Sequence, residues 1–170
     1  LKVLRAGTAS EMALRRFERE AEVLGRLEHP GIARIYEVSS FDVGDGQQPF
    51  FAMEYIAGRS LTEYVTANDA SVAERLALVA EVCEALAYAH DRGVIHRDVK
   101  PSNILVQDDG QPRIVDFGVA RLTDGDVNAT TMHTSTGEII GTLPYMSPEQ
   151  IAGDSAEVAA RSDVYSCGVV

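Results

Sequence analysis

Two aspartates and an asparagine are spaced so that they could act together on a phosphate. Asp98 and Asn103 belong to the segment 96–103, His-Arg-Asp-Val-Lys-Pro-Ser-Asn, and Asp116 begins the triplet Asp-Phe-Gly thirteen residues later. Phosphoryl transfer needs one carboxylate beside the attacking hydroxyl, and a carboxylate and an amide oxygen that hold magnesium ions on the phosphates. The spacing therefore predicts a phosphate-transfer site with Asp98 as general base and with Asn103 and Asp116 as metal ligands.

Helices and short strands are expected around these residues. A long helix should run from 72 to near 93, because apolar residues recur at three- and four-residue steps after the capping box 71–74. A last helix should begin near Ser162. Short apolar strands are expected on either side of the polar segments, at 94–95, 104–106 and 113–115.

The first part of the chain has the pattern of a strand, a helix and two further strands. The helix should follow a capping box at 8–11 and end at the His-Pro-Gly turn 29–31. A turn-forming stretch should join the last two strands. The expected elements are a strand at 1–5, a helix at 14–27, and strands at 32–38 and 49–55.

Composition and charge exclude several classes of function. The 170 residues carry a formal net charge of −11, which argues against a nucleic-acid-binding surface because such a surface needs a basic patch. The sequence contains neither an apolar run long enough for a membrane span nor a signal peptide. We therefore expect a cytoplasmic protein, or the cytoplasmic domain of a membrane-anchored one.

The two cysteines and the two ends of the sequence complete this general description. Cys83 and Cys167 lie in apolar stretches without metal-ligand spacing, which predicts two buried small side chains. The sequence begins at Leu1 without an initiator methionine and stops within an apolar stretch, so we interpret it as a piece of a larger protein.

The segments 96–103 and 116–118, followed by Ser-Pro-Glu at 147–149, resemble the eukaryotic-like protein kinase family. The resemblance covers essentially the whole chain and is closest to bacterial Ser/Thr kinases. It implies an α+β, two-lobed fold. Residues 1–56 would be a partial N-lobe, which runs from the strand at 1–5 to the hinge and contains a β-sheet and the αC helix. Residues 57–170 would be a partial, mainly helical C-lobe. It also implies the cofactors ATP and Mg2+, with Mn2+ as a substitute.

The same resemblance assigns two residues to the nucleotide's phosphates. Lys2 resembles the lysine that grips the α- and β-phosphates, although the residues that usually precede it lie before Leu1. For an isolated lysine at the start of a strand, a solvated surface position would be the alternative. Glu20 resembles the αC glutamate that pairs with this lysine, at the edge of the apolar stripe of the expected helix. Four competing carboxylates lie nearby, Glu11, Glu18, Glu22 and Glu28.

The segment 51–56, Phe-Ala-Met-Glu-Tyr-Ile, resembles the strand and hinge that bind adenine. In that interpretation Met53 is the gatekeeper residue. The Glu54 carbonyl and the Ile56 N–H would form hydrogen bonds with the adenine ring. Leu105 and Val115 would lie beneath the ring. Without the other motifs, a plain buried strand would be the better interpretation of this segment.

Substrate specificity and regulation are also implied by the resemblance. Lys100 marks Ser/Thr specificity in the family and would neutralise the transferring phosphate with help from Thr142, so the partner is a protein substrate bearing Ser or Thr. Arg97 would bind a phosphate on the chain's own loop, for which Thr134 and Thr136 are the candidate self-phosphorylation sites. A polar loop that serves only solubility is the alternative. Leu24, His96 and Phe117 would stack into the family's regulatory spine, which Asp163 anchors.

Two other functions fit parts of the sequence. A pseudokinase, which binds nucleotide or acts as a scaffold, would share the fold without catalysis. A small-molecule phosphotransferase would share it too, but would lack the lysine at 100 and the Ser-Pro-Glu segment. We also expect this piece alone to be inactive and poorly stable, because Glu149 would lack the arginine that pairs with it in the family.

Overall fold

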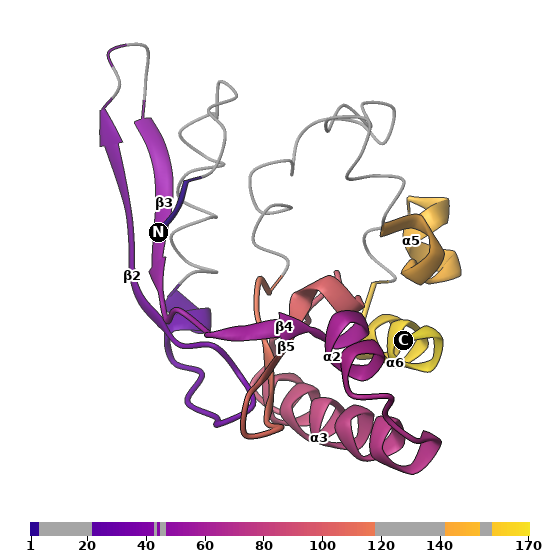
Figure 1. Cartoon of the computed structure of the whole chain (residues 1–170). Coiled ribbons are helices and arrows are strands. Elements are labelled where there is room, and N and C mark those ends of the chain that lie inside the picture. Colours follow the sequence, from indigo (N-terminus) through magenta and orange to yellow (C-terminus); the bar gives the residue numbers. More distant parts are fainter. Residues whose placement is uncertain (4–21, 43, 45–46, 118–141, 154–157) are drawn as a thin grey trace.

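The computed structural model describes residues 1–3, 22–42, 44, 47–117, 142–153 and 158–170, without the side chain of Lys2 (Figure 1). A three-stranded antiparallel sheet has the order β1-β3-β2. Its two long strands pair Val38 with Phe51, whose side chain is 2% exposed. The strands are β1 (Lys2–Val3), β2 (Ile35–Asp42) and β3 (Gln47–Met53).

A second antiparallel sheet carries the residues on either side of the predicted chemistry. It consists of β4 (Gly58–Ser60), β5 (Ile104–Gln107) and β6 (Pro112–Ile114), in the order β4-β5-β6. The segment before β2 also binds β6, because Ala33 donates to the Ile114 carbonyl at 2.9 Å and Ile114 donates to the Gly31 carbonyl at 2.8 Å. Strand β6 is therefore held on both sides, directly before Asp116.

Helices α2 and α3 pack against the second sheet. In α3 the predicted capping box is confirmed, since Ser71 Oγ accepts from the Glu74 N–H at 3.3 Å and Glu74 Oε2 accepts from the Ser71 N–H at 2.7 Å. The helices are α2 (Leu61–Ala67), α3 (Val72–His90), α5 (Pro148–Ala152) and α6 (Ala160–Val169), with 3-10 turns η1 (Pro101–Asn103) and η3 (Leu143–Tyr145).

The core lies between α3 and the second sheet. Ala85 and Ala89 are fully buried on one face of α3, where their small side chains allow the sheet to approach closely. A Cβ atom added to Gly31 would come within 3.0 Å of the Ala85 Cβ, so the contact leaves little spare room. The buried strand residues of this core include Ile104, Val106 and Ile114.

The α+β class is confirmed, and most predicted elements are present with shifted ends. Strand β2 begins at Ile35 rather than at Ile32, because residues 31–33 bind β6 instead. Residues 94–95 form no strand. Of the predicted 14–27 helix, residues 22–27 are described, and the helix ends at Gly25 rather than at Leu27, whereas the capping box 8–11 lies outside the described residues.

The prediction of two buried cysteines is wrong for Cys83. Its side chain is exposed on α3, whereas Cys167 on α6 is half-buried. The thiol groups are neighbours, and burial together with the Cys83 thiol raises the pKa of Cys167 to about 12. Among the described residues, no helix is long and apolar enough to cross a membrane.

Candidate active site

Four predicted site residues, Asp98, Lys100, Asn103 and Thr142, form one connected cluster. Asp98 Oδ2 accepts from Asn103 Nδ2 at 2.9 Å and lies 2.9 Å from Lys100 Nζ. Lys100 Nζ also donates to Thr142 Oγ1 at 2.8 Å. The side chains of Lys100 and Asp98 are 19% and 26% exposed, so their charges are partly shielded from water. A carboxylate oriented in this way can accept a proton from a hydroxyl group placed beside it.

A tight turn brings Asn103 back to Asp98. Pro101 starts the 3-10 turn η1, and the Asn103 N–H donates to the Lys100 carbonyl at 2.9 Å. The Asn103 amide nitrogen then binds both the Asp98 carboxylate and the Asp98 carbonyl, the latter at 2.8 Å. Because the nitrogen is engaged in these bonds, the amide oxygen is the atom of Asn103 that can bind a metal ion.

Asp116 lies next to this turn. The preceding residue, Val115, donates its N–H to the Asn103 carbonyl at 2.9 Å, which ties the end of β6 to η1. Asp116 has a φ of 60°, in the left-handed region that non-glycine residues rarely adopt, so its backbone conformation must be imposed by the surrounding structure. The backbone that carries Asp116 is therefore tied to that of Asn103, and a carboxylate and an amide oxygen are both ligands that magnesium prefers.

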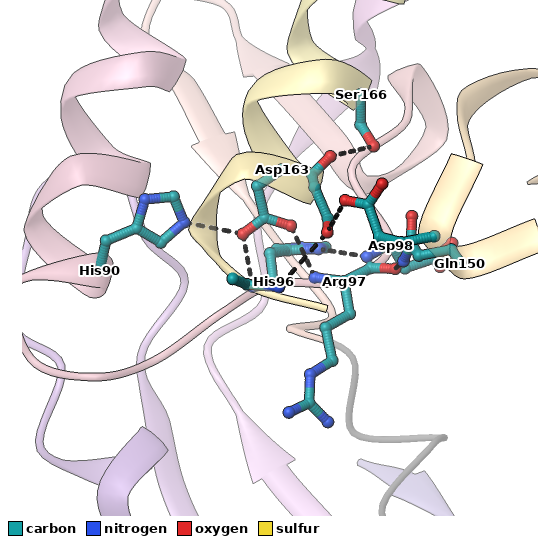
Figure 2. A network of polar contacts seen from close by, with 10 residues as sticks. His90, His96, Arg97, Asp98, Gln150, Asp163 and Ser166 are labelled. Atoms are coloured by element: carbon teal, nitrogen blue, oxygen red, sulfur yellow. Dashed lines mark hydrogen bonds and ion pairs between the residues drawn. The ribbon is translucent and has the colours of Figure 1, made fainter. Parts of the chain in front are cut away.

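Asp163 on α6 holds the backbone of the segment that carries Asp98 (Figure 2). Its Oδ2 accepts from the His96 N–H and its Oδ1 accepts from the Arg97 N–H, both at 2.8 Å, while His90 Nε2 lies 2.8 Å from Oδ2. The Asp163 side chain is 1% exposed. Arg97 has a φ of 66°, so this buried carboxylate fixes a second left-handed residue, directly before Asp98.

His96 has a structural position rather than that of a base. Its Nε2 lies 3.1 Å from the Val115 carbonyl and its Nδ1 accepts from the Asp98 N–H at 3.2 Å, which together define a neutral ring protonated on Nε2. Complete burial lowers the pKa of His96, against the opposing effect of Asp163. The ring packs against Phe117 with centroids 4.7 Å apart. Leu24, the third residue expected in this stack, is also buried.

The segment predicted to bind adenine follows directly on β3. Met53 ends the strand, Glu54 is half-buried, and Ile56 is 6% exposed. Within the described part of the chain, neither the Glu54 carbonyl nor the Ile56 N–H takes part in a backbone hydrogen bond outside the strands. Leu105 on β5 and Val115 after β6 are both half-buried.

Several predicted residues cannot be placed. Lys2 lies on β1, where its backbone pairs with that of Phe51 on β3. Glu20, Thr134 and Thr136 lie outside the described residues.

Glu149 has partners of its own within the described residues. Its Oε1 accepts from Ser162 Oγ at 2.6 Å and lies 3.9 Å from Arg161 Nε, with its side chain 16% exposed. The bond from Ser162 lowers the pKa of Glu149. A partner on the neighbouring helix α6 therefore already satisfies this carboxylate.

Sequence reasoning missed two further residues that support the site. His90 at the end of α3 contacts Asp163, and Gln150 on α5 donates through Nε2 to the Arg97 carbonyl at 2.7 Å. Both contacts join segments that are far apart in the sequence. Neither residue lies in a spacing pattern that would have identified it.

Comparisons with known proteins agree with this geometry. The family model described as "Protein kinase domain" matches residues 1–170. Among curated proteins, the chain is 40% identical over 172 residues to the serine/threonine-protein kinase PknB of Mycobacterium leprae and 40% identical over 173 residues to PknB of Mycolicibacterium smegmatis. It is also 40% identical over 172 residues to the probable serine/threonine-protein kinase PknB of Corynebacterium glutamicum.

These matches cover the whole of this chain, but only 27% of the two mycobacterial proteins and 26% of the corynebacterial one. The chain thus spans about a quarter of the length of these relatives. The family model matches the chain from its first residue to its last. The chain also has the polar cluster that phosphoryl transfer needs. Together these two observations decide the classification. The chain belongs to the protein kinase domain family.

Proposed function

We propose that the chain is part of the catalytic domain of a serine/threonine protein kinase, which transfers the γ-phosphate of ATP to hydroxyl groups of proteins. The observation that carries the proposal is the connected cluster of Asp98, Lys100, Asn103 and Thr142 beside Asp116. In this proposal residues 1–56 belong to the N-lobe and residues 57–170 to the C-lobe.

Each member of the cluster has a role that follows from its contacts. Asp98 is the general base, because Asn103 and Lys100 bind one carboxylate oxygen and thereby orient the other. Lys100, between Asp98 and Thr142, supplies positive charge for the transferred phosphate. Asp116 and the Asn103 oxygen are the proposed ligands for Mg2+, or for Mn2+ in its place. The metal, when bound, neutralises phosphate charge.

The nucleotide site combines the hinge with the second sheet. The Glu54 carbonyl and the Ile56 N–H are the proposed partners of adenine, and Met53 is the gatekeeper. Leu105 and Val115 would contact the ring from below. We keep Lys2 and Glu20 as the proposed ion pair on the α- and β-phosphates, on the basis of their motifs alone.

Protein hydroxyls are the proposed acceptors because of Lys100 and of the relatives' names, which specify serine/threonine kinases. Phosphorylation of Thr134 and Thr136 is the proposed means of activation, with Arg97 as the phosphate-binding residue. We place the domain in the cytoplasm, alone or as the cytoplasmic part of a membrane-anchored protein, because both cysteines are free, as in a reducing compartment.

The test is a transfer assay with the full-length protein, labelled ATP and Mg2+. We expect label on serine and threonine of a general protein substrate, and none on tyrosine. Binding of Mg-ATP without transfer would instead indicate a pseudokinase. Transfer to small alcohols or amines, but not to proteins, would indicate a small-molecule phosphotransferase. Either result would refute the proposal.

A further inference from the structure

An ion pair joins the proposed adenine-binding hinge to the strand that leads to Asp116. Arg113 on β6 donates through one guanidinium nitrogen to Glu54 Oε2 at 2.5 Å. The same carboxylate oxygen accepts from the Arg34 N–H at 3.1 Å. The same Arg113 nitrogen lies 3.4 Å from the Ile32 carbonyl. The pair is therefore connected to the backbone at two further points.

This pair differs from the surface ion pairs of the chain. The side chains of Arg113 and Glu54 are 16% and 28% exposed, whereas those of Arg26 and Glu22 are 73% and 67% exposed. Exposed pairs contribute little because water screens them, whereas partly buried charges interact more strongly. The Nε of Arg113 is also buried without a hydrogen-bond partner within the described structure, which is unfavourable for folding. The unpaired Nε therefore offsets part of the stability that the ion pair contributes, so the pair can have a role other than stability.

The location of the two residues indicates what that role is. Glu54 directly follows the gatekeeper position Met53, and its N–H donates to the Arg34 carbonyl at 2.7 Å. Arg113 lies three residues before Asp116, on a strand that is bonded on both sides. One end of the ion pair thus fixes the backbone proposed to bind adenine, and the other end belongs to the strand that positions a proposed magnesium ligand.

We propose that the Glu54–Arg113 ion pair is a positioning contact for the nucleotide. It holds the hinge at the distance from Asp116 that a molecule with both an adenine and a triphosphate requires. The inference rests on the proposed function, because it takes ATP as the ligand. Loss of the pair should weaken ATP binding while leaving the transfer step nearly unchanged, since Asp98 and Lys100 do not contact it.

The experiment compares Arg113→Met, Glu54→Gln and the double variant in the full-length protein. We expect each single variant to raise the KM for ATP roughly fivefold to tenfold, as expected for one partly buried charged hydrogen bond, with kcat within about twofold of the wild type. The double variant should resemble Arg113→Met, because both lack the ion pair, whereas Glu54→Gln loses the charge and keeps one acceptor oxygen. Arg113→Lys should restore part of the affinity.

Two controls separate positioning from a general effect on folding. Arg75→Met changes an arginine that donates to the Ala70 carbonyl at the start of α3, and it should leave the KM unchanged. Adenosine cannot reach both the hinge and Asp116, so its affinity should fall less in Arg113→Met than that of Mg-ATP. A purely structural contact would lower the melting temperature without separating the two ligands.

The possible results are distinct. An unchanged KM in correctly folded Glu54→Gln, or equal losses for adenosine and Mg-ATP, would overturn the inference. An increase in kcat would also overturn it, because the pair would then restrain the hinge rather than position the nucleotide. If the wild-type protein neither binds nor turns over ATP, the proposed function itself fails, which is a different result from any of these.

Discussion

Replacement of Asp163 by alanine should disrupt the segment that carries the proposed general base. The carboxylate accepts the N–H groups of His96 and Arg97, and it is 1% exposed, so water cannot readily take its place. Alanine would leave two buried donors without an acceptor. The left-handed conformation of Arg97, at a φ of 66°, would lose the contact that fixes it.

The size of the effect follows from these two donors. Each unsatisfied buried N–H group costs about 1–3 kcal/mol, so Asp163→Ala should lower the free energy of unfolding by roughly 2–6 kcal/mol. This is a large share of the ~5–15 kcal/mol of a typical domain. His90, which is 16% exposed, can bond to water instead and adds little. Asp163→Asn keeps one acceptor oxygen and should cost about half as much.

The assay is urea unfolding of the full-length protein, followed by a probe of its kinase domain, together with kcat for transfer. Asp108→Ala is the matched control, because Asp108 is exposed in the turn after β5. A stability of Asp163→Ala within about 0.5 kcal/mol of the wild type, as for ordinary surface substitutions, would refute this reasoning. So would equal effects of the alanine and asparagine variants.

Three further predictions concern other parts of the chain. Burial lowers the pKa of His96, so as the pH falls this histidine is protonated in the unfolded state before it is protonated in the folded state. The free energy of unfolding should therefore decline below about pH 6.5. Unfolding at a series of pH values should show this decline, and His96→Phe should reduce it. Gly58→Ala would place a Cβ atom 2.6 Å from the Val106 carbonyl oxygen and should lower the free energy of unfolding by about 1–3 kcal/mol. In the control Gly25→Ala the added Cβ atom meets no atom within 4 Å, so the protein should not be destabilised. Thermal unfolding of the two variants checks this difference. Mass spectrometry after incubation with Mg-ATP should find phosphate on Thr134 or Thr136, and activity equal to the wild type in a variant with alanine at both positions would contradict their role.

Local sequence was sufficient to predict that Asp98, Lys100 and Asn103 lie together, whereas Thr142 is distant in the sequence and was assigned from the family resemblance. Asp98, Lys100 and Asn103 are joined by a short turn that Pro101 starts, so their spacing nearly determines their contacts. The capping box at Ser71 is also local, and it is present as predicted.

Contacts between distant segments could not be read from the sequence. His90 meets Asp163 across 73 positions, and Arg113 meets Glu54 across 59, because helix packing and sheet order bring them together. The exposure of Cys83 has the same origin, since it depends on which face of α3 meets the sheet. For the start of β2, apolar character alone could not distinguish pairing with β3 from pairing with β6.

The central claim is that Asp98 acts as the general base, and Asp98→Asn in the full-length protein tests it most directly. Asparagine has nearly the same shape, so Mg-ATP affinity should stay within about threefold of the wild type, because the phosphates and the metal are held by other groups. The rate of phosphate transfer to protein should fall at least about 100-fold, the usual contribution of a general base. Transfer at close to the wild-type rate, with unchanged nucleotide affinity, would contradict the account.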